Sequence, residues 1–220
     1  MKSLIFDLDG TLVETAPDLI ETLNVILTRE GYPPVDYHDA RLMVGAGVKT
    51  LLARGLSAVD GPVAQDRLDR LYEDYLTHYA EHIADLSRPF PGMENALDAL
   101  AAQGWRLAVC TNKLEWLSVR LLEALNLKDR FAAICGQDTF GIAKPNPEVL
   151  LRTIAAAGGD PAQAIMIGDS ITDIATARAA NIPVIAVDFG YTNVPVRELG
   201  PDRVISHFDG LAEAVAALRG

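Results

Sequence analysis

Positive charge is scarce in this sequence: 19 Lys and Arg residues stand against 30 Asp and Glu residues, giving a formal net charge of −11 at pH 7. A general nucleic-acid binder or a protein that binds anionic membranes needs a basic face to neutralise phosphate groups. The composition therefore disfavours both classes of partner. An anionic small molecule can still bind if a few lysines, arginines or a metal ion gather at one place, so the position of each lysine matters.

Cysteine is also rare, with only Cys110 and Cys135 in 220 residues. Both lie inside apolar segments, which favours buried free thiols over a disulfide and fits a reducing cytosol. Long apolar runs are missing as well. The N-terminus enters Leu4-Ile5-Phe6-Asp7 too early for a secretory signal, and no run reaches the length of about 20 residues that spans a membrane. We therefore expect a soluble, cytoplasmic protein with no membrane partner.

What the sequence does contain is an alternation of short apolar runs, rich in β-branched residues, with helix-like stretches. This alternation predicts an α/β fold with a three-layer, Rossmann-like core, in which helices cover both faces of a parallel sheet. The predicted strands are residues 4–8, 106–111, 132–135, 164–168 and 183–187, with 203–206 as an edge strand. The predicted helices of this core are residues 93–103, 116–125, 147–157, 173–179 and 210–218.

Roughly a hundred residues separate the first predicted strand from the next, far more than the dozen or so that connect neighbouring parallel strands. Amphipathic periodicity in this interval predicts two long helices, and no strand pattern interrupts them. The stretch Arg88-Pro-Phe-Pro-Gly cannot be helical and indicates a linker back to the core. We therefore predict a core formed by residues 1–15 and 88–220 and an inserted, all-helical cap domain at residues 16–87.

Reactive or charged side chains follow four of the predicted strands. Ligands in open α/β sheets bind beyond the carboxyl ends of the strands, so these residues are the candidates for chemistry. They are Asp7, Asp9 and Thr11 after the first strand, Thr111, Asn112 and Lys113 after the second, Lys144 in the loop after the third, and Asp169 and Asp173 after the fourth. Each group alone has an ordinary explanation as a turn, a helix cap or a solvated lysine. Carboxylates gathered at one sheet edge repel one another, however, so the cluster should hold a divalent cation, and its oxygen ligands suit Mg²⁺ better than Zn²⁺.

These residues carry a close resemblance to the haloacid dehalogenase superfamily of phosphotransferases. The signature of that superfamily is Asp-x-Asp-x-Thr at the first strand, Ser or Thr at the second, a downstream Lys, and Gly-Asp-x-x-x-Asp. All four parts are present in order, at Asp7 to Thr11, Thr111, Lys144 and Gly168 to Asp173. The set spans nearly the whole core, and its position before a helical insertion resembles the subgroup with a small helical cap. Thr11 is expected to hydrogen-bond locally and fix the loop rather than touch the substrate.

The resemblance implies a role for each core residue. Asp7 would be the nucleophile that forms an aspartyl-phosphate, and Asp9 would protonate the leaving oxygen and later activate water, for which its pKa should lie above that of an isolated Asp. Thr111 and the backbone N–H of Asn112 would hold the phosphoryl oxygens, and Lys144 would neutralise their charge. The implied Mg²⁺ ligands are Asp7, the backbone carbonyl of Asp9, Asp169 and, in the outer shell, Asp173.

The cap should select the substrate, because the core contacts only the phosphoryl group. Its most unusual stretch is Val44-Gly-Ala-Gly-Val-Lys-Thr50, which has two interpretations. One is a turn between helices followed by a solvated lysine. The other is a tip where the backbone N–H groups of Gly45 and Gly47 approach an anionic substrate, with Lys49 or Arg41 adding charge.

Three segments further resemble the phosphoglycolate phosphatases within the superfamily: the cap glycines, Thr-Asn-Lys at the second motif, and the segment after the first motif. Glu14 and Thr15 depart conservatively from that family, which more often has Asp and Ser there. This resemblance implies hydrolysis of 2-phosphoglycolate, a small phosphorylated metabolite, by a monomer or homodimer.

Other functions remain open from the sequence. Within the superfamily they are a β-phosphoglucomutase-like mutase, a pyrophosphatase and a phosphonoacetaldehyde hydrolase; the last needs a cap lysine for a Schiff base, and Lys49 keeps it open. From a different class, a phospho-accepting receiver module also combines an Asp, Mg²⁺, a Thr and a Lys at a sheet edge. Receivers, however, are about half this length and carry no cap. An inactive family member is disfavoured because every motif residue is intact.

Overall fold

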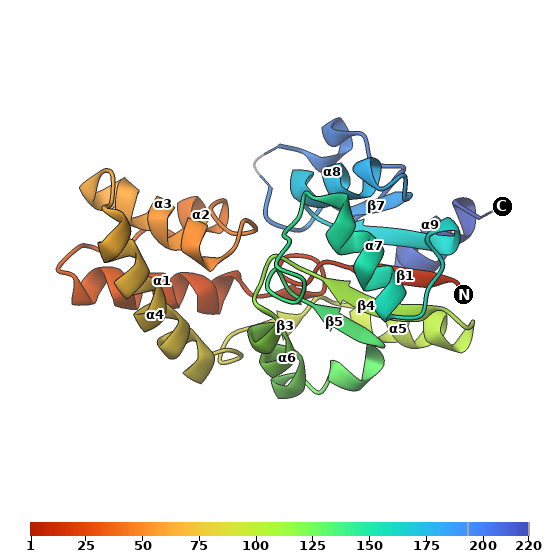
Figure 1. The fold of residues 1–220 in the computed structure, drawn as a ribbon, viewed down its shortest axis with the longest axis horizontal. Helices are drawn as coiled ribbons and strands as arrows, with labels where there is room; N and C mark the ends of the chain where they lie inside the picture. Colours follow the sequence, from red (N-terminus) through yellow and green to blue (C-terminus); the bar gives the residue numbers. More distant parts are fainter. Residues whose placement is uncertain (193, 220) are drawn as a thin grey trace.

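A computed structural model describes residues 1–192 and 194–219 of the chain (Figure 1). In this part of the chain, six parallel strands form the main sheet in the order β5-β4-β1-β6-β7-β8. The strands are β1 (Ser3–Phe6), β4 (Arg106–Cys110), β5 (Ala133–Cys135), β6 (Ala164–Gly168), β7 (Val184–Val187) and β8 (Arg203–Ile205). The predicted α/β fold is confirmed, and the last of the predicted strands does lie at an edge of the sheet.

The strands are buried on both faces because their side chains alternate between two separate apolar layers. Along β1, Leu4 and Phe6 enter one layer and Ile5 enters the other. The helices that cover the first layer are α5 (Met93–Ala102), α6 (Glu115–Ala124) and α9 (Leu211–Ala217). Those that cover the second are α7 (Pro147–Ala156) and α8 (Ile171–Ala179). Short 3₁₀ turns complete the connections at η1 (Lys128–Arg130), η2 (Pro161–Gln163), η3 (Val196–Leu199) and η4 (Phe208–Gly210).

The strand order reverses at β1, which places three carboxyl ends side by side. From β1 the chain passes to β4 and β5 on one side, then crosses to β6 on the other side of β1. Phe6, the last residue of β1, is in register with Val109 on β4 and with Ile167 on β6. Such a switch point is where ligands bind in open α/β sheets, so the residues that follow these three strands face one shared site.

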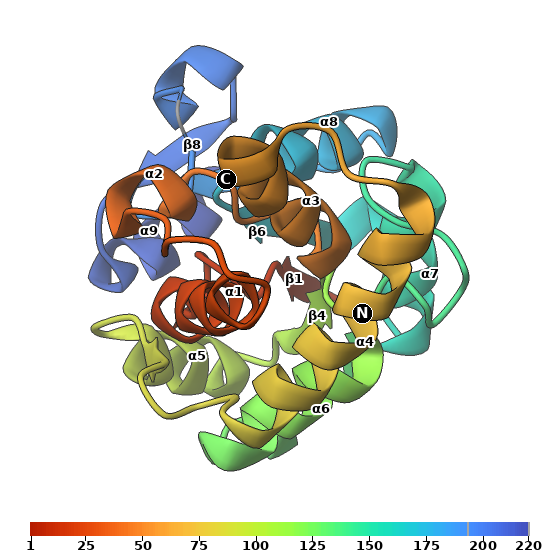
Figure 2. The same ribbon diagram turned by 90° about the vertical axis from the view of Figure 1, so that its left-hand side faces the viewer.

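The insertion between β1 and β4 is helical. Its helices are α1 (Ala16–Arg29), α2 (Tyr37–Arg41), α3 (Val48–Asp60) and α4 (Gln65–Glu81). They extend from one end of the core, opposite the end that carries the N- and C-termini (Figure 1), and lie over the carboxyl ends of the strands when viewed from that side (Figure 2). The apolar side of α1 packs on α4, where the hydroxyl of Tyr75 donates to the carbonyl of Leu19 at 2.7 Å.

The two segments that connect the insertion to the core are paired with each other. Strand β2 (Val13–Glu14) runs antiparallel to β3 (Arg88–Pro89), so the predicted non-helical linker is a strand of a small second sheet. The carboxylate of Asp18, in the first turn of α1, also accepts hydrogen bonds from the backbone N–H groups of Leu86 and Ser87 and from the Ser87 hydroxyl. The segment that leaves the core and the segment that returns to it are therefore joined twice, once by the β2–β3 pair and once by Asp18.

Both cysteines are buried free thiols, as predicted, and lie opposite each other in register on β4 and β5. Within the described ranges, every helix is too short or too polar to cross a membrane.

Candidate active site

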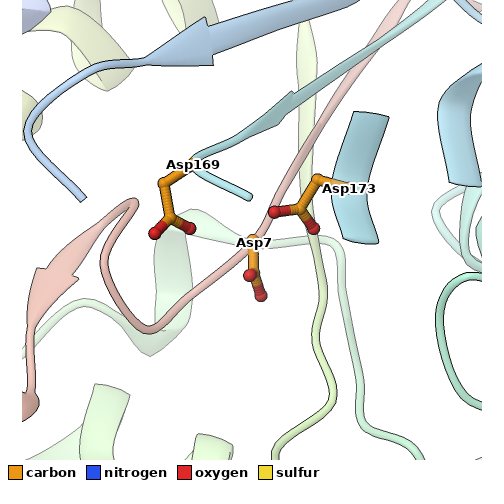
Figure 3. Close-up of side chains that lie close together, drawn as sticks. All are labelled: Asp7, Asp169 and Asp173. Atoms are coloured by element: carbon orange, nitrogen blue, oxygen red, sulfur yellow. The ribbon is translucent and has the colours of Figure 1, made fainter. Parts of the chain in front are cut away.

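Three buried carboxylates meet at the carboxyl edge of the sheet (Figure 3). Asp7 directly follows β1, Asp169 directly follows β6, and Asp173 lies in the first turn of α8. One carboxylate oxygen of each lies within 4.8 Å of the others. The sequence separates these side chains by up to 166 positions, and the register of β1 with β6 brings them together.

Lys144 is the ammonium that balances part of this negative charge. Its Nζ lies 2.9 Å from Oδ1 of Asp7 and 2.6 Å from Oδ1 of Asp173, with the lysine side chain almost wholly buried. Burial opposes the charged form of the lysine, but the two carboxylates outweigh it and hold the pKa of Lys144 above its usual value. The side chain of Asn112 fixes the Lys144 loop, because its Oδ1 accepts from the backbone N–H of Lys144 at 2.8 Å and its Nδ2 donates to the carbonyl at 3.1 Å.

Asp173 is held by the start of its own helix. Ser170 and Asp173 form a reciprocal capping box, in which the Ser170 hydroxyl donates to Oδ2 of Asp173 at 2.6 Å. This leaves Oδ1 for Lys144 and orients the carboxylate toward the cluster. The same hydrogen bonds that begin α8 therefore fix one member of the acidic group.

Asp169 is held from both sides. Its Oδ1 accepts from the hydroxyl of Thr11 at 3.0 Å, and its Oδ2 accepts from the backbone N–H of Tyr191 at 2.7 Å. The expectation of a local bond for Thr11 is therefore wrong, because its partner lies 158 positions away across β1 and β6. Gly10 permits this approach: its φ is +79°, and a Cβ there would come within 2.6 Å of Oδ2 of Asp169.

The carboxylates strain one another electrostatically. Burial raises the pKa of Asp7 from 3.8 to about 7, with Asp173 adding to the rise and Lys144 opposing it. Burial also raises the pKa of Asp169 to about 8, with Asp173 and Asp7 adding and the Tyr191 N–H opposing. These values reflect the cost of holding several ionised carboxylates together away from water. One ammonium does not remove that cost, and a divalent cation would.

The donor set therefore fits a hard divalent metal ion. It consists only of oxygen atoms, the oxygens converge, and the group carries more negative charge than Lys144 neutralises. Oxygen ligands of this kind suit Mg²⁺ rather than Zn²⁺. Among the described residues, Asp7, Asp169 and Asp173 form the group of acidic, His or Cys side chains that lie close enough together to hold a metal ion.

Asp9 forms an ion pair with Lys113 and is not one of the three clustered carboxylates. Nζ of Lys113 lies 3.0 and 3.3 Å from the two carboxylate oxygens of Asp9 and donates to the hydroxyl of Tyr79, on α4 of the insertion, at 2.9 Å. The Lys113 side chain is only 1% exposed, whereas that of Asp9 is 15% exposed and reaches the pocket. Thr111 lies beside them, and its Oγ1 accepts from the Lys113 backbone N–H at 3.2 Å.

A pocket between the insertion and the core opens onto these groups. Its core lining is Asp7, Asp9, Thr111, Asn112 and Lys113, and its insertion lining is Leu19, Val44, Gly45, Gly47, Val48 and Leu51. Gly47 has a φ of +85° and precedes α3, so the glycine stretch forms a turn between helices. A Cβ at Gly47 would lie 3.4 Å from the carbonyl oxygen of Asn112, which shows that the insertion closes directly on the second motif.

The structure places the two predicted cationic side chains of the insertion elsewhere. Lys49 forms an ion pair with Asp69 on α4 and lies over the ring of Tyr72, outside the pocket lining. Arg41 crosses to the core at a different point: its guanidinium donates to the carbonyl of Phe189 at 3.0 Å and lies 4.8 Å from the ring centroid of Tyr191. The charge of Lys49 therefore stabilises the packing of α3 on α4, and the charge of Arg41 stabilises the contact of the insertion with the core.

Comparison with known proteins agrees with this geometry. Residues 4–187 match the family model of haloacid dehalogenase-like hydrolases, which is most of the chain. The chain belongs to the haloacid dehalogenase-like hydrolases. It is 48% identical to a phosphoglycolate phosphatase of Mesorhizobium japonicum over 97% of this chain and 94% of that protein, and 45% identical to one of Caulobacter vibrioides over 98% and 91%. The crystal structure of a predicted phosphoglycolate phosphatase from Haemophilus somnus 129pt superposes with a TM-score of 0.88 at 28% identity, covering 97% of each chain.

Membership of the haloacid dehalogenase-like hydrolases confirms the resemblance drawn from the four motifs and makes the chain a hydrolytic enzyme of that family. Two neighbours of the motif residues differ in how far the sequence indicates them: Lys113 is among the predicted candidates but without a role, and Tyr191 is not among them. Lys113 ends the Thr-Asn-Lys segment after the second predicted strand, and its pairing with Asp9 has no signal in the sequence. Tyr191 follows β7 in a loop without any periodic pattern, so the sequence offers no signal for it either.

Proposed function

We propose that the chain is a magnesium-dependent phosphatase that hydrolyses 2-phosphoglycolate to glycolate and phosphate through an aspartyl-phosphate on Asp7. The observation that carries this proposal is the convergence of Asp7, Asp169 and Asp173 beside Lys144 at the switch point of the sheet. In this proposal residues 1–15 and 88–220 form the catalytic core, and residues 16–87 form the cap that selects the substrate.

Asp7 and Asp9 divide the reaction between them. The Asp7 carboxylate attacks phosphorus. The Leu8 N–H, at 2.8 Å, and Lys144 both contact its Oδ1 and so fix the orientation of the carboxylate for this attack. Asp9 is two residues further on, reaches the pocket, and gives a proton to the departing glycolate oxygen. The same carboxylate then takes a proton from the water that hydrolyses the aspartyl-phosphate.

The remaining core residues hold the phosphoryl group. Thr111 and the backbone N–H of Asn112 bind its oxygens, and Lys144 offsets the charge that develops on them. The apolar side chains of the cap, including Leu19, Val44 and Leu51, exclude bulk water from the pocket, which strengthens each of these electrostatic contacts.

The residues that would hold Mg²⁺ are Asp7, Asp169 and the backbone carbonyl of Asp9, with Asp173 in the outer shell. The bound ion would supply electrostatic stabilisation of the phosphoryl charge in the transition state. Thr11 and the Tyr191 N–H keep the Asp169 carboxylate in place for this purpose.

The identity of the substrate is supported by the relatives and by the pocket. The relatives at 48% and 45% identity, which this chain matches over nearly their full lengths, are phosphoglycolate phosphatases. The cap meets the core at Gly47, so the space beyond the phosphoryl group is short. The phosphonoacetaldehyde hydrolase alternative loses its support, because the amine of Lys49 is paired with Asp69 outside the pocket lining.

The test is a panel of small phosphates assayed with Mg²⁺. We expect kcat/KM for 2-phosphoglycolate to exceed that for β-glucose 1-phosphate by at least about 100-fold, because the close approach of Gly47 to Asn112 limits the space for a hexose. The same margin is expected over pyrophosphate, because the relatives at 48% and 45% identity are phosphoglycolate phosphatases. A reversed ranking would overturn the substrate and leave the chemistry of Asp7 standing. Multiple turnovers would also separate an enzyme from a receiver module, which is labelled once and stops.

Stabilisation by Mg²⁺ should depend on pH. The pKa values of Asp7 and Asp169, about 7 and about 8 in the folded protein, lie above the 3.8 of the unfolded chain. The contribution of these two carboxyl groups to the free energy of unfolding is therefore fully present below about pH 3.8. It is lost as the pH rises from about 3.8 to about 8, because the folded protein must then hold both groups in their charged form. Mg²⁺ offsets the charge once the protons have left. We expect 10 mM Mg²⁺ (roughly saturating) to raise Tm more at pH 8 than at pH 6; an equal shift at both pH values would contradict this.

A further inference from the structure

Lys113 is a buried cation whose position the phosphoryl chemistry alone does not explain. Lys144 already lies between Asp7 and Asp173 on the phosphoryl side of the site. Lys113 lies on the other side of Asp9, in the wall of the pocket, with its side chain 1% exposed. Burying an ammonium is costly, so a second one in the pocket wall calls for a ligand or a structural role.

Two of the three hydrogen bonds of the Lys113 ammonium go to the same carboxylate, that of Asp9, and they differ in length. An ammonium has three N–H donors. Within the described residues, Nζ donates to the carboxylate of Asp9 and to the hydroxyl of Tyr79. The contact to the second Asp9 oxygen is the longest of the three at 3.3 Å, so an acceptor in the pocket can take that donor while the 3.0 Å bond to Asp9 and the bond to Tyr79 are kept.

Among the side chains that line the pocket, Lys113 is the cation. The other lining residues are the carboxylates Asp7 and Asp9, two polar residues, two glycines and four aliphatic side chains. Among the described residues, a substrate whose far end is anionic would find a cationic side chain in the pocket lining at Lys113, since Lys49 is held by Asp69, and Arg41 contacts Glu14 and the Phe189 carbonyl. A neutral far end would gain nothing there.

We propose that Lys113 binds the carboxylate of an α-phosphoryl carboxylate substrate and so determines the specificity of the enzyme. This inference rests on the proposed function and names the residue that recognises the half of the substrate the core motifs do not touch. Lys113 acts as a specificity residue, in direct contact with substrate, while it also keeps its ion pair with Asp9.

The distances set how far this carboxylate lies from the phosphoryl group. Nζ of Lys113 is 3.0 and 3.3 Å from the two Asp9 oxygens. When one Asp9 oxygen hydrogen-bonds to the ester oxygen of the substrate, Nζ of Lys113 lies within about 6 Å of that ester oxygen. A carboxylate attached to the carbon next to the ester oxygen reaches a donor at that separation. A longer acid places its charge past Lys113, against the aliphatic side chains of the cap.

The test compares 2-phosphoglycolate with ethyl phosphate, which has the same two-carbon chain and no carboxylate. The variants are Lys113→Met and Lys113→Gln; the second keeps an amide that can hydrogen-bond to Asp9 and covers the case in which the first fails to fold. We expect kcat/KM for 2-phosphoglycolate to fall by about 1,000-fold and for ethyl phosphate by about tenfold, which reduces the preference by about 100-fold. Lys113→Arg should retain most of the preference because it keeps the positive charge.

Equal losses for the two substrates would overturn the proposal, because they would mean that Lys113 acts only by positioning Asp9. Lys128→Met is the matched control: Lys128 is an exposed lysine paired with Glu123 on the surface of the core, and both rates should stay within about twofold of wild type. A wild-type enzyme with no preference for 2-phosphoglycolate would instead reject the proposed function. A wild-type preference that survives in Lys113→Gln would reject this inference and leave the proposed function intact.

Discussion

Asp7→Asn is expected to lower kcat for 2-phosphoglycolate by at least about 10⁴-fold, because an amide does not attack phosphorus and no aspartyl-phosphate forms. The variant should fold. Asn matches Asp in size, and its carbonyl oxygen can still accept from the Leu8 N–H. Replacing a buried carboxylate that the site disfavours in its ionised form also removes repulsion from Asp173. Phosphate release in the steady state and Tm by calorimetry measure the two effects separately.

The control for this variant is Asp129→Asn. Asp129 lies in η1 on the exposed surface of the core, so the same chemical change there should leave both kcat and Tm near their wild-type values. If Asp7→Asn kept kcat within tenfold of wild type, Asp7 could not be the nucleophile. The acidic cluster would then have to act by binding alone.

Lys144→Met should damage stability and activity together. Nζ of Lys144 is within 2.9 Å of Asp7 and 2.6 Å of Asp173, and all three side chains are buried. Removing the cation leaves the two carboxylates without a counter-charge, so we expect the free energy of unfolding without metal to fall by about 3–5 kcal/mol. Loss of the same charge from the transition state should lower kcat/KM by about 1,000-fold or more. Urea unfolding and initial rates measure these losses.

A second substitution separates the two effects. Asp173→Asn in the Lys144→Met background removes one of the unpaired carboxylates, so it should restore part of the stability and none of the activity. Lower pH should also restore stability to Lys144→Met, since protons then neutralise the carboxylates. A loss of less than about 1 kcal/mol in Lys144→Met would show that Asp7 and Asp173 do not depend on this ammonium.

The core of the site was predictable because parallel strands impose a simple rule of proximity. Apolar runs located the strands, and the residues after β1, β4 and β6 had to meet once those strands were neighbours. The sheet order itself does not follow from hydrophobic pattern, yet the motif residues at three strand ends already indicated which ends meet. Asp7, Thr111 and Asp169 were therefore placed correctly at one edge of the sheet.

Side-chain partners across the molecule were much less accessible from the sequence. Lys49 follows the glycine-rich stretch Val44-Gly-Ala-Gly-Val, and Lys113 ends Thr-Asn-Lys. In the structure α3 packs on α4, so Lys49 pairs with Asp69, whereas Lys113, in the turn after β4, pairs with Asp9. Periodicity reports which face of an element is buried and carries no information about such pairings. Strands as short as β2 and β3, with two residues each, have no period to detect.

The pairing of β2 with β3 has a mechanical consequence for the helical insertion. Two separate single-stranded tethers would let the helices both swing and twist about the core, whereas a hydrogen-bonded pair resists torsion and leaves bending as the easy degree of freedom. Asp18 strengthens this restriction, because it ties Leu86 and Ser87 to the base of α1. A bending motion about this paired connection would return Gly47 to the same position opposite Asn112.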